Sequence, residues 1–314
     1  MPKTAKNPAD YILPLNMNGL SGRMIRMLPP KGKTSEILYI YGHHSSLERY
    51  FGVADYLNQY AGVTVPDLPG FGGMDPFYKI GEKPSLDNMA DYLAAFIKLR
   101  YKNKRFSIAG FSLGFMIVTR MLQKHPEIAE KIDILLSQTG FTHKGDFVYN
   151  RRTFFIFRWT TSVLSNRLPA AFVKYIVFRP IFIRIAYKFL EPLFVKAANS
   201  KIRDGDKEEY KKRVDFEIHL WQCNDPRTYM DIAVSMFTLD LTGQHINLAV
   251  HHVTMDHDRY FNNVKVEQHM RAIYKDFQLV KSKGPAHAPS ILATAKEAEP
   301  YIPRSLLRLL NKKN

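Results

Sequence analysis

The sequence predicts an α/β fold, with a mostly parallel central sheet and helices on both of its faces. Apolar strand-like runs alternate with amphipathic helix-like segments over most of the chain, and this alternation is typical of β-α-β units. The chain has 314 residues, of which 46% are hydrophobic. That is enough for one large domain with a sizeable core, together with an inserted subdomain.

The first half of the chain contains the clearest alternation. Buried, apolar runs predict strands, and runs with apolar residues three and four apart predict helices. The predicted elements are a strand over 36–42, a helix over 46–61, a strand and Gly/Pro loop over 63–73, a helix over 84–102, a strand over 105–110, a helix over 113–125 and a strand over 131–141.

The alternation stops between residues 142 and 240. This segment is aromatic and basic, and Pro169, Pro180 and Pro192 interrupt it, so we expect several short helices. The alternation of strands and helices then resumes with a strand over 245–253, a helix over 264–277, a strand over 277–284 and a helix at the C-terminal end. The sequence therefore predicts a core made of residues 1–141 and 241–314, with a helical insertion over 142–240.

A serine lies between two glycines at the end of one predicted strand. Residues 108–116 read IAGFSLGFM, and the G-x-S-x-G spacing at a strand–turn–helix junction is typical of a nucleophile elbow. Ser112 would take a strained backbone conformation there, with the glycines giving room for close packing of strand and helix. The same spacing also occurs by chance in ordinary turns, so the interpretation depends on partners elsewhere.

A serine hydroxyl needs a histidine base, a carboxylate that orients this base, and N–H donors for a developing oxyanion. A Gly/Pro loop, SKGPAHAPS, carries His287 after the last predicted strand. The loop after the preceding strand, VTMDHDRYF, carries Asp256 and Asp258. The order Ser, Asp, His along the chain is the one found in α/β-hydrolases.

With these segments the chain resembles the α/β-hydrolase superfamily, in particular its capped serine hydrolases of the lipase and esterase type. VTVPDLPGFGG resembles the loop before the elbow, VTMDHDRYF the acid loop and GPAHAP the histidine loop. The resemblance covers about residues 20–141 and 245–300, and it implies that the 142–240 insertion is a cap, or lid, over the active site.

The resemblance also implies a role for individual residues. Ser112 would be the nucleophile, His287 the general base and acid, and Asp258 the carboxylate that supports His287. Asp256 fits the acid position less well and is interpreted as a turn residue.

The backbone N–H groups of Leu113 and His43 would form the oxyanion hole. The usual His-Gly pair of the family is here Tyr41-Gly42. Backbone donation does not depend on this side chain, but the shape of the acyl pocket does.

Other groups have simpler interpretations. Asp67 is expected to tie its loop structurally, and GFGG at 70–73 lacks the G-x-G-x-x-G spacing of a dinucleotide site. His251 and His252 are adjacent on a strand and point to opposite faces, so neither they nor His257 are expected to bind a metal. The sequence predicts neither cofactor nor metal.

The net charge of +16 is uneven, because residues 144–213 hold 16 Lys and Arg against 6 Asp and Glu. A solvated face, an anionic membrane surface and nucleic acid could each explain this, but no nucleic-acid-binding motif accompanies the charge. The four basic residues at the centre of the segment do not share one helical face, so contact with a membrane stays open. They are Lys174, Arg179, Arg184 and Lys188.

The single cysteine, Cys223, is interpreted as a buried, inert thiol. There is no run long enough for a signal peptide or a spanning helix. We therefore expect a cytoplasmic protein, with peripheral membrane association as an open alternative.

The sequence predicts a hydrolase that cleaves a small carboxylic ester, of the acyl or lipid type, through an acyl-enzyme. Two alternatives remain. One is other chemistry on the same three residues: C–C bond hydrolysis, prolyl aminopeptidase, thioesterase or acyltransferase activity. The other is a protein that keeps the fold for binding alone.

Overall fold

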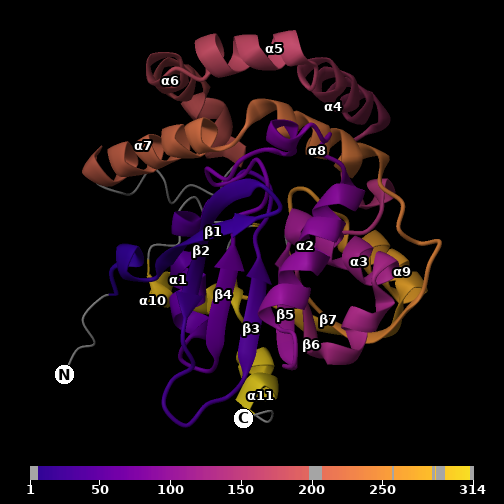
Figure 1. Ribbon diagram of the computed structural model, residues 1–314. Helices are drawn as coiled ribbons and strands as arrows, with labels where there is room; N and C mark the ends of the chain where they lie inside the picture. Colours follow the sequence, from indigo (N-terminus) through magenta and orange to yellow (C-terminus); the bar gives the residue numbers. More distant parts are fainter. Residues whose placement is uncertain (1–5, 198–206, 257, 285–286, 288–293, 312–314) are drawn as a thin grey trace.

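The computed structural model describes residues 6–197, 207–256, 258–284, 287 and 294–311. Its centre is an eight-stranded sheet with the strand order β1-β2-β4-β3-β5-β6-β7-β8, and helices cover both faces (Figure 1). The strands are β1 (Ile12–Met17), β2 (Leu20–Met27), β3 (Glu36–Ile40), β4 (Gly62–Pro66), β5 (Phe106–Phe111), β6 (Ile132–Gln138), β7 (Ile246–Thr254) and β8 (Tyr274–Lys281).

The sheet is parallel from β4 through β3, β5, β6 and β7 to β8, and antiparallel where β2 pairs with β1 and β4. This confirms the predicted α/β class. All residues of β3, β4 and β5 are buried, which explains why they read as continuous apolar runs rather than alternating ones.

The helices around the sheet follow the predicted sequence of elements. They are α1 (Leu47–Leu57), α2 (Leu86–Arg100), α3 (Leu113–Lys124), α9 (Asn263–Ile273), α10 (Ala295–Ala298) and α11 (Arg304–Asn311). Side-chain caps begin several of them; for example, Ser85 Oγ accepts the N–H of Asn88 at the start of α2, the usual role of a serine at a helix N-cap.

One predicted boundary is wrong. The helix expected over 264–277 ends at Ile273, and β8 begins at Tyr274. Tyr274 and Phe277 are three residues apart, a spacing that suits a helical face. Here both residues belong to a strand instead, because β8 pairs with β7 through Tyr274 opposite Ile246 and Phe277 opposite Val250. Both side chains are buried in this strand.

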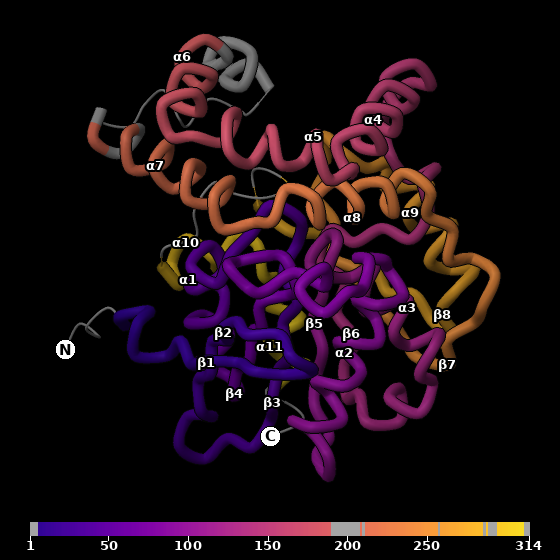
Figure 2. The backbone as a smooth tube through the Cα atoms, turned by 45° about the horizontal axis from the view of Figure 1, so that its top comes forward, coloured from indigo at the N-terminus to yellow at the C-terminus, as the bar shows by residue number. Residues whose placement is uncertain are grey.

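Residues 151–197 and 207–238 form a helical layer beyond one end of the sheet (Figures 1 and 2). The layer consists of α4 (Arg151–Leu164), α5 (Arg167–Phe172), a π-helical turn (Val173–Val177), α6 (Pro180–Ala197), α7 (Lys207–Cys223) and α8 (Pro226–Thr238). These segments are helical as expected, but α6 and α7 are long rather than short.

The junction of α7 and α8 holds this layer to the loop that follows β4. The N–H of Gly73 donates to the Cys223 carbonyl, and the N–H of Asp225 donates to the Gly70 carbonyl, both at 2.8 Å. The side chain of Asn224 accepts the N–H of Gly72 at 3.0 Å. The layer therefore lies at the carboxyl ends of the parallel strands. Cys223 is partly exposed, which corrects the expectation of a buried thiol.

Across the residues that the structure describes, none of the helices combines the length and the apolar character needed to cross a membrane.

Candidate active site

Ser112 occupies a sharp turn between β5 and α3. Its backbone has φ 49° and ψ −114°, which is an unfavourable conformation for a residue with a side chain. The N–H of Ser112 donates to the Gln138 carbonyl at the end of β6, at 3.0 Å. The neighbouring strand thus holds the strained turn in place, and Ser112 is 7% exposed.

The two glycines of the motif are required by the close packing around this turn. A Cβ on Gly110 would lie 2.5 Å from the Cα of Phe115, and a Cβ on Gly114 would lie 2.2 Å from the Ile40 carbonyl oxygen. Both neighbours are backbone atoms, which cannot move without shifting the strand or the helix. Gly114 therefore brings the start of α3 against the end of β3.

His287 and Asp258 form a buried pair. His287 Nδ1 lies 2.6 Å from Asp258 Oδ2, and their side chains are 6% and 2% exposed. Asp258 Oδ1 accepts the N–H groups of Tyr260 at 2.8 Å and Phe261 at 3.2 Å.

Burial alone raises the pKa of Asp258. The hydrogen bond and charge of His287, with the two N–H donors, outweigh this and hold that pKa below its usual value. Asp258 is therefore ionised and fixed where it can orient the imidazole.

Asp256, the alternative acid, points elsewhere. Its Oδ1 lies 3.2 Å from Lys281 Nζ, and its side chain is 66% exposed. The structure thus brings Asp258 to His287 and leaves Asp256 at the surface. His257 lies outside the described residues.

Three aromatic rings surround His287. The centroids of Phe111, Tyr260 and Phe261 lie 5.3, 5.0 and 5.4 Å from that of the imidazole. Phe111 directly precedes Ser112, so the same strand end contacts the histidine. No hydrogen bond joins Ser112 Oγ to His287 within the described chain; such bonds are often long without substrate.

The two N–H groups predicted to bind an oxyanion are unengaged. Leu113 is the first residue of α3, and His43 follows β3 in the loop beside it. Within the part of the chain that the structure describes, neither backbone N–H donates a hydrogen bond. Free N–H groups at a helix N-terminus are suited to binding negative charge.

The side chain of His43 has a different function. Its Nε2 donates to the Tyr229 carbonyl on α8 at 3.0 Å, and the two rings lie 3.7 Å apart between centroids. Burial lowers the pKa of His43 to about 3, so the imidazole stays neutral. The next residue, His44, lies 3.0 Å from Glu217 of α7 through its Nε2. The loop that carries one proposed oxyanion donor is therefore tied to the helical layer.

Asp67 is fully buried and holds the loop after β4. Its Oδ1 accepts from the Tyr41 hydroxyl at 2.9 Å, and that hydroxyl accepts the Leu68 N–H at 3.0 Å. Arg23 Nε lies 3.4 Å from the other carboxylate oxygen. Burial raises the pKa of Asp67. These contacts agree with the structural interpretation of this carboxylate.

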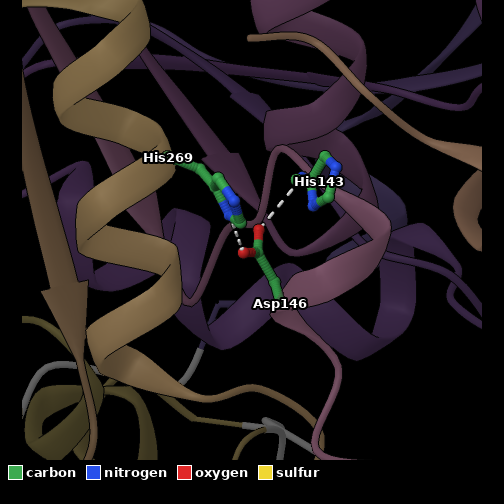
Figure 3. A group of neighbouring side chains, drawn as sticks. All are labelled: His143, Asp146 and His269. Atoms are coloured by element: carbon green, nitrogen blue, oxygen red, sulfur yellow. Dashed lines mark hydrogen bonds and ion pairs between the residues drawn. The ribbon is translucent and has the colours of Figure 1, made fainter. Parts of the chain in front are cut away.

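A separate group of metal-ligating side chains contains His143, Asp146 and His269 (Figure 3). One ligand atom from each lies within 4.8 Å of the others. These atoms already have partners, since Asp146 Oδ1 lies 2.5 Å from His269 Nδ1 and His143 Nδ1 accepts the Gly145 N–H at 2.9 Å. Asp146 Oδ2 accepts the N–H groups of Thr142 and His143.

Sequence reasoning missed this group, because its members lie on a turn after β6 and on α9. The contacts described above tie the two together. That the protein needs no metal stays a prediction.

His251 and His252 do not form a site together. His252 is buried and lies 2.8 Å from Ser137 Oγ through its Nδ1, whereas His251 is partly exposed. Burial lowers the pKa of His252 to about 4, so this histidine is a neutral hydrogen-bond partner of the core.

Comparison with known proteins points to one family. Residues 37–142 match the alpha/beta hydrolase fold family, and no curated protein matches the sequence. Together with the observed sheet and turn, this match shows that the chain has the α/β-hydrolase fold.

Solved structures of low sequence identity share the fold. MenH from S. aureus is 12% identical, with a TM-score of 0.63, over 93% of this chain and 99% of that one. An esterase from Thermogutta terrifontis is 13% identical, with a TM-score of 0.59, over 96% and 99% of the chains. An enol-lactonase from Burkholderia xenovorans is 11% identical, with a TM-score of 0.61, over 95% and 99%.

Proposed function

We propose that this protein is a serine hydrolase that cleaves a carboxylic ester through an acyl-enzyme intermediate. The observation that carries the proposal is the buried Asp258–His287 pair beside a strained serine turn. A protein that used the fold for binding alone would need neither the ionised carboxylate on the imidazole nor the strained serine.

In this mechanism Ser112 Oγ attacks the acyl carbonyl carbon while its proton passes to His287 Nε2. Asp258 holds the other nitrogen and stabilises the imidazolium. The N–H groups of Leu113 and His43 bind the oxyanion. The intermediate then collapses, and the alcohol leaves with the proton from His287. A water molecule, deprotonated by His287, attacks the acyl carbon; collapse of this second intermediate releases the acid and returns the proton to Ser112.

The helical segment 142–240 would be a cap on this site. The contacts of His43 with Tyr229 and of His44 with Glu217 support this proposal, because they join the loop of one oxyanion donor to α7 and α8. A movement of the helical layer would therefore displace the loop that carries His43. The three aromatic rings around His287 favour an acyl or lipid-type substrate over a polar one.

The test is hydrolysis of p-nitrophenyl esters from acetate to palmitate. We expect turnover in the wild-type protein, none in Ser112→Ala or His287→Ala, and unchanged turnover in Ser235→Ala, which removes a hydroxyl bonded only within α8. Near-UV circular dichroism checks that each variant is folded. Turnover retained in Ser112→Ala would overturn the proposal, and the preferred chain length would separate acyl esters from other chemistry on the same residues.

A further inference from the structure

The outward side of α4, α5, α6 and the π-helical turn is unusually apolar. Among the described residues, 14 of the 20 exposed large hydrophobic side chains lie between residues 155 and 189. Figures 1 and 2 both show these helices as the outermost layer of the molecule. Phe157 contacts the inward rings of Tyr149 and Phe237. We call the other 13 side chains the outer apolar surface: Phe155, Ile156, Trp159, Val163, Leu168, Phe172, Tyr175, Ile176, Val177, Ile181, Phe182, Ile185 and Phe189.

Helix α6 has two apolar sides. Ile183 is 5% exposed and faces inward, with Tyr187 partly buried one turn later. Ile181 and Ile185 are 62% and 45% exposed, and each lies about 160° around the helix from Ile183. A surface helix of a globular protein normally has one apolar stripe, facing the core, so the packing of this domain does not explain the second side.

Helix α4 repeats this arrangement. Phe154 packs inward, with ring centroids 6.1 Å from Phe147 and 5.3 Å from Phe237. Trp159 and Val163 are exposed and lie about 140° and 180° around the helix from Phe154. The apolar character of the cap therefore exceeds what its own core needs.

The charge on this layer has one sign. Residues 151–189 contain eight Lys and Arg and neither Asp nor Glu, and all eight are exposed. Two of them pair with carboxylates of neighbouring segments, Arg184 with Asp215 at 2.8 Å and Lys174 with Asp225 at 3.9 Å. The eight are Arg151, Arg152, Arg158, Arg167, Lys174, Arg179, Arg184 and Lys188.

Three of the arginines share a recess at the start of α4. This hollow has a volume of about 520 Å³ and is lined by Arg151, Arg152, Arg158, Phe154 and Phe155. Guanidinium groups bind phosphate oxygens in pairs of parallel hydrogen bonds, and phenylalanine rings favour acyl chains. The recess thus offers both kinds of contact that a phospholipid presents at the surface of a bilayer.

We propose that the outer apolar surface docks on an anionic lipid bilayer, with α4 and α6 lying in the interface. Apolar side chains enter the boundary between headgroups and acyl chains, and the basic residues contact anionic headgroups. Trp159 and Tyr175 have the amphipathic rings that favour this depth. The docking itself is independent of the reaction at Ser112. That the bilayer supplies the acyl substrate rests on the proposed function.

The test measures binding without catalysis. Ser112→Ala protein is mixed with sedimenting vesicles of phosphatidylglycerol or of phosphatidylcholine alone. We expect binding to the anionic vesicles that weakens with salt and little binding to the neutral ones. Changing Arg151, Arg152 and Arg158 together to Gln should weaken binding on the order of 100-fold. The matched control changes Lys98 and Arg100, at the C-terminal end of α2, and Lys102, in the turn that follows it, to Gln and should bind as before. Equal binding of the two triple variants would overturn the proposal.

Trp159 reports the depth of docking directly. In a Trp221→Phe variant, Trp159 is the remaining tryptophan, and its emission should move to shorter wavelength and be quenched by brominated acyl chains. Trp159→Ser with Ile185→Ser should weaken binding at least about tenfold, while Leu99→Ser, which alters an exposed side chain on α2, should not. An unchanged Trp159 spectrum with vesicles, or concentration-dependent dimers in sedimentation that bury Trp159 without lipid, would overturn the proposal and assign the surface to a second copy of the chain.

Discussion

Phe111 and Trp159 are both large aromatic side chains on regular elements, but Phe111 is 5% exposed beside the serine turn and Trp159 is 62% exposed on α4. Around Phe111, the packing of strand ends against glycines and the hydrogen bonds of the turn leave the backbone almost no room to move. Around Trp159, apolar side chains face outward among cations. One region is shaped by the folding of this chain, whereas the other has a surplus of apolar surface that folding does not use.

This difference separates two kinds of evidence for function. At the carboxyl ends of the strands, the proposed activity is inferred from atoms that the fold holds within hydrogen-bond distance. On the helical layer, the proposed docking is inferred from exposed apolar surface, which is normally limited in a monomer.

The largest effect should come from the acid of the site. Asp258→Asn keeps the shape but removes the charge that fixes the His287 tautomer, so we expect kcat to fall by about 10⁴-fold. Asp256→Asn makes the same chemical change on an exposed side chain and should leave kcat within about twofold. Steady-state hydrolysis of one ester by both variants checks this, and equal losses would contradict the assignment of Asp258.

The next effect concerns packing. Phe111→Ala should lower the free energy of unfolding by about 4 kcal/mol, because a buried ring leaves a cavity. Trp159→Ala, on the outer apolar surface, should change it by no more than about 0.5 kcal/mol. Urea denaturation followed by circular dichroism measures both. A large loss in Trp159→Ala would mean that the outer apolar surface packs within the protein.

Backbone crowding gives a third comparison. Gly114→Ala places a methyl group against the Ile40 carbonyl and should cost about 3 kcal/mol, as overpacking does. Gly243→Ala meets nothing within 4 Å and should be neutral or slightly stabilising. Thermal unfolding of the two variants distinguishes them; a stable Gly114→Ala would show that β3 and α3 can separate at the elbow.

The smallest effect is the acid dependence of stability. The pKa of Asp258 is held below its usual value, so its contribution is present above the unfolded-state pKa and is lost as pH falls through the folded-state pKa. The wild-type protein should therefore lose more stability than Asp258→Asn as pH is lowered below about 4. Urea midpoints at pH 6 and pH 3 test this, and parallel losses in the two proteins would contradict it.

The turn at Ser112, at the carboxyl end of β5, was largely predictable because the residues that determine it are close in sequence. The glycine spacing around Ser112 indicates the backbone turn directly, and the structure has this turn. The β1–β2 hairpin was missed, although its Asn18-Gly19 turn, with φ 53° and 78°, is a strong hairpin signal. The start of β8 was misplaced because Tyr274 and Phe277 satisfy helical spacing as well as burial from a strand.

The contacts of the helical layer were not predictable in the same way. That Tyr229 and Glu217 meet His43 and His44 depends on how α7 and α8 pack on the core, which no short motif encodes. The excess of aromatic residues between 142 and 240 is visible in the sequence. Which of them face outward became apparent only from the packing of α4 and α6.

The central claim, that Ser112 is an activated nucleophile, is tested most directly by reaction with a fluorophosphonate, followed by mass spectrometry of the peptides. The account predicts one phosphonyl group, attached to the peptide that contains Ser112, and its absence in His287→Ala. Labelling of a different serine, or no labelling of folded wild-type protein, would contradict it.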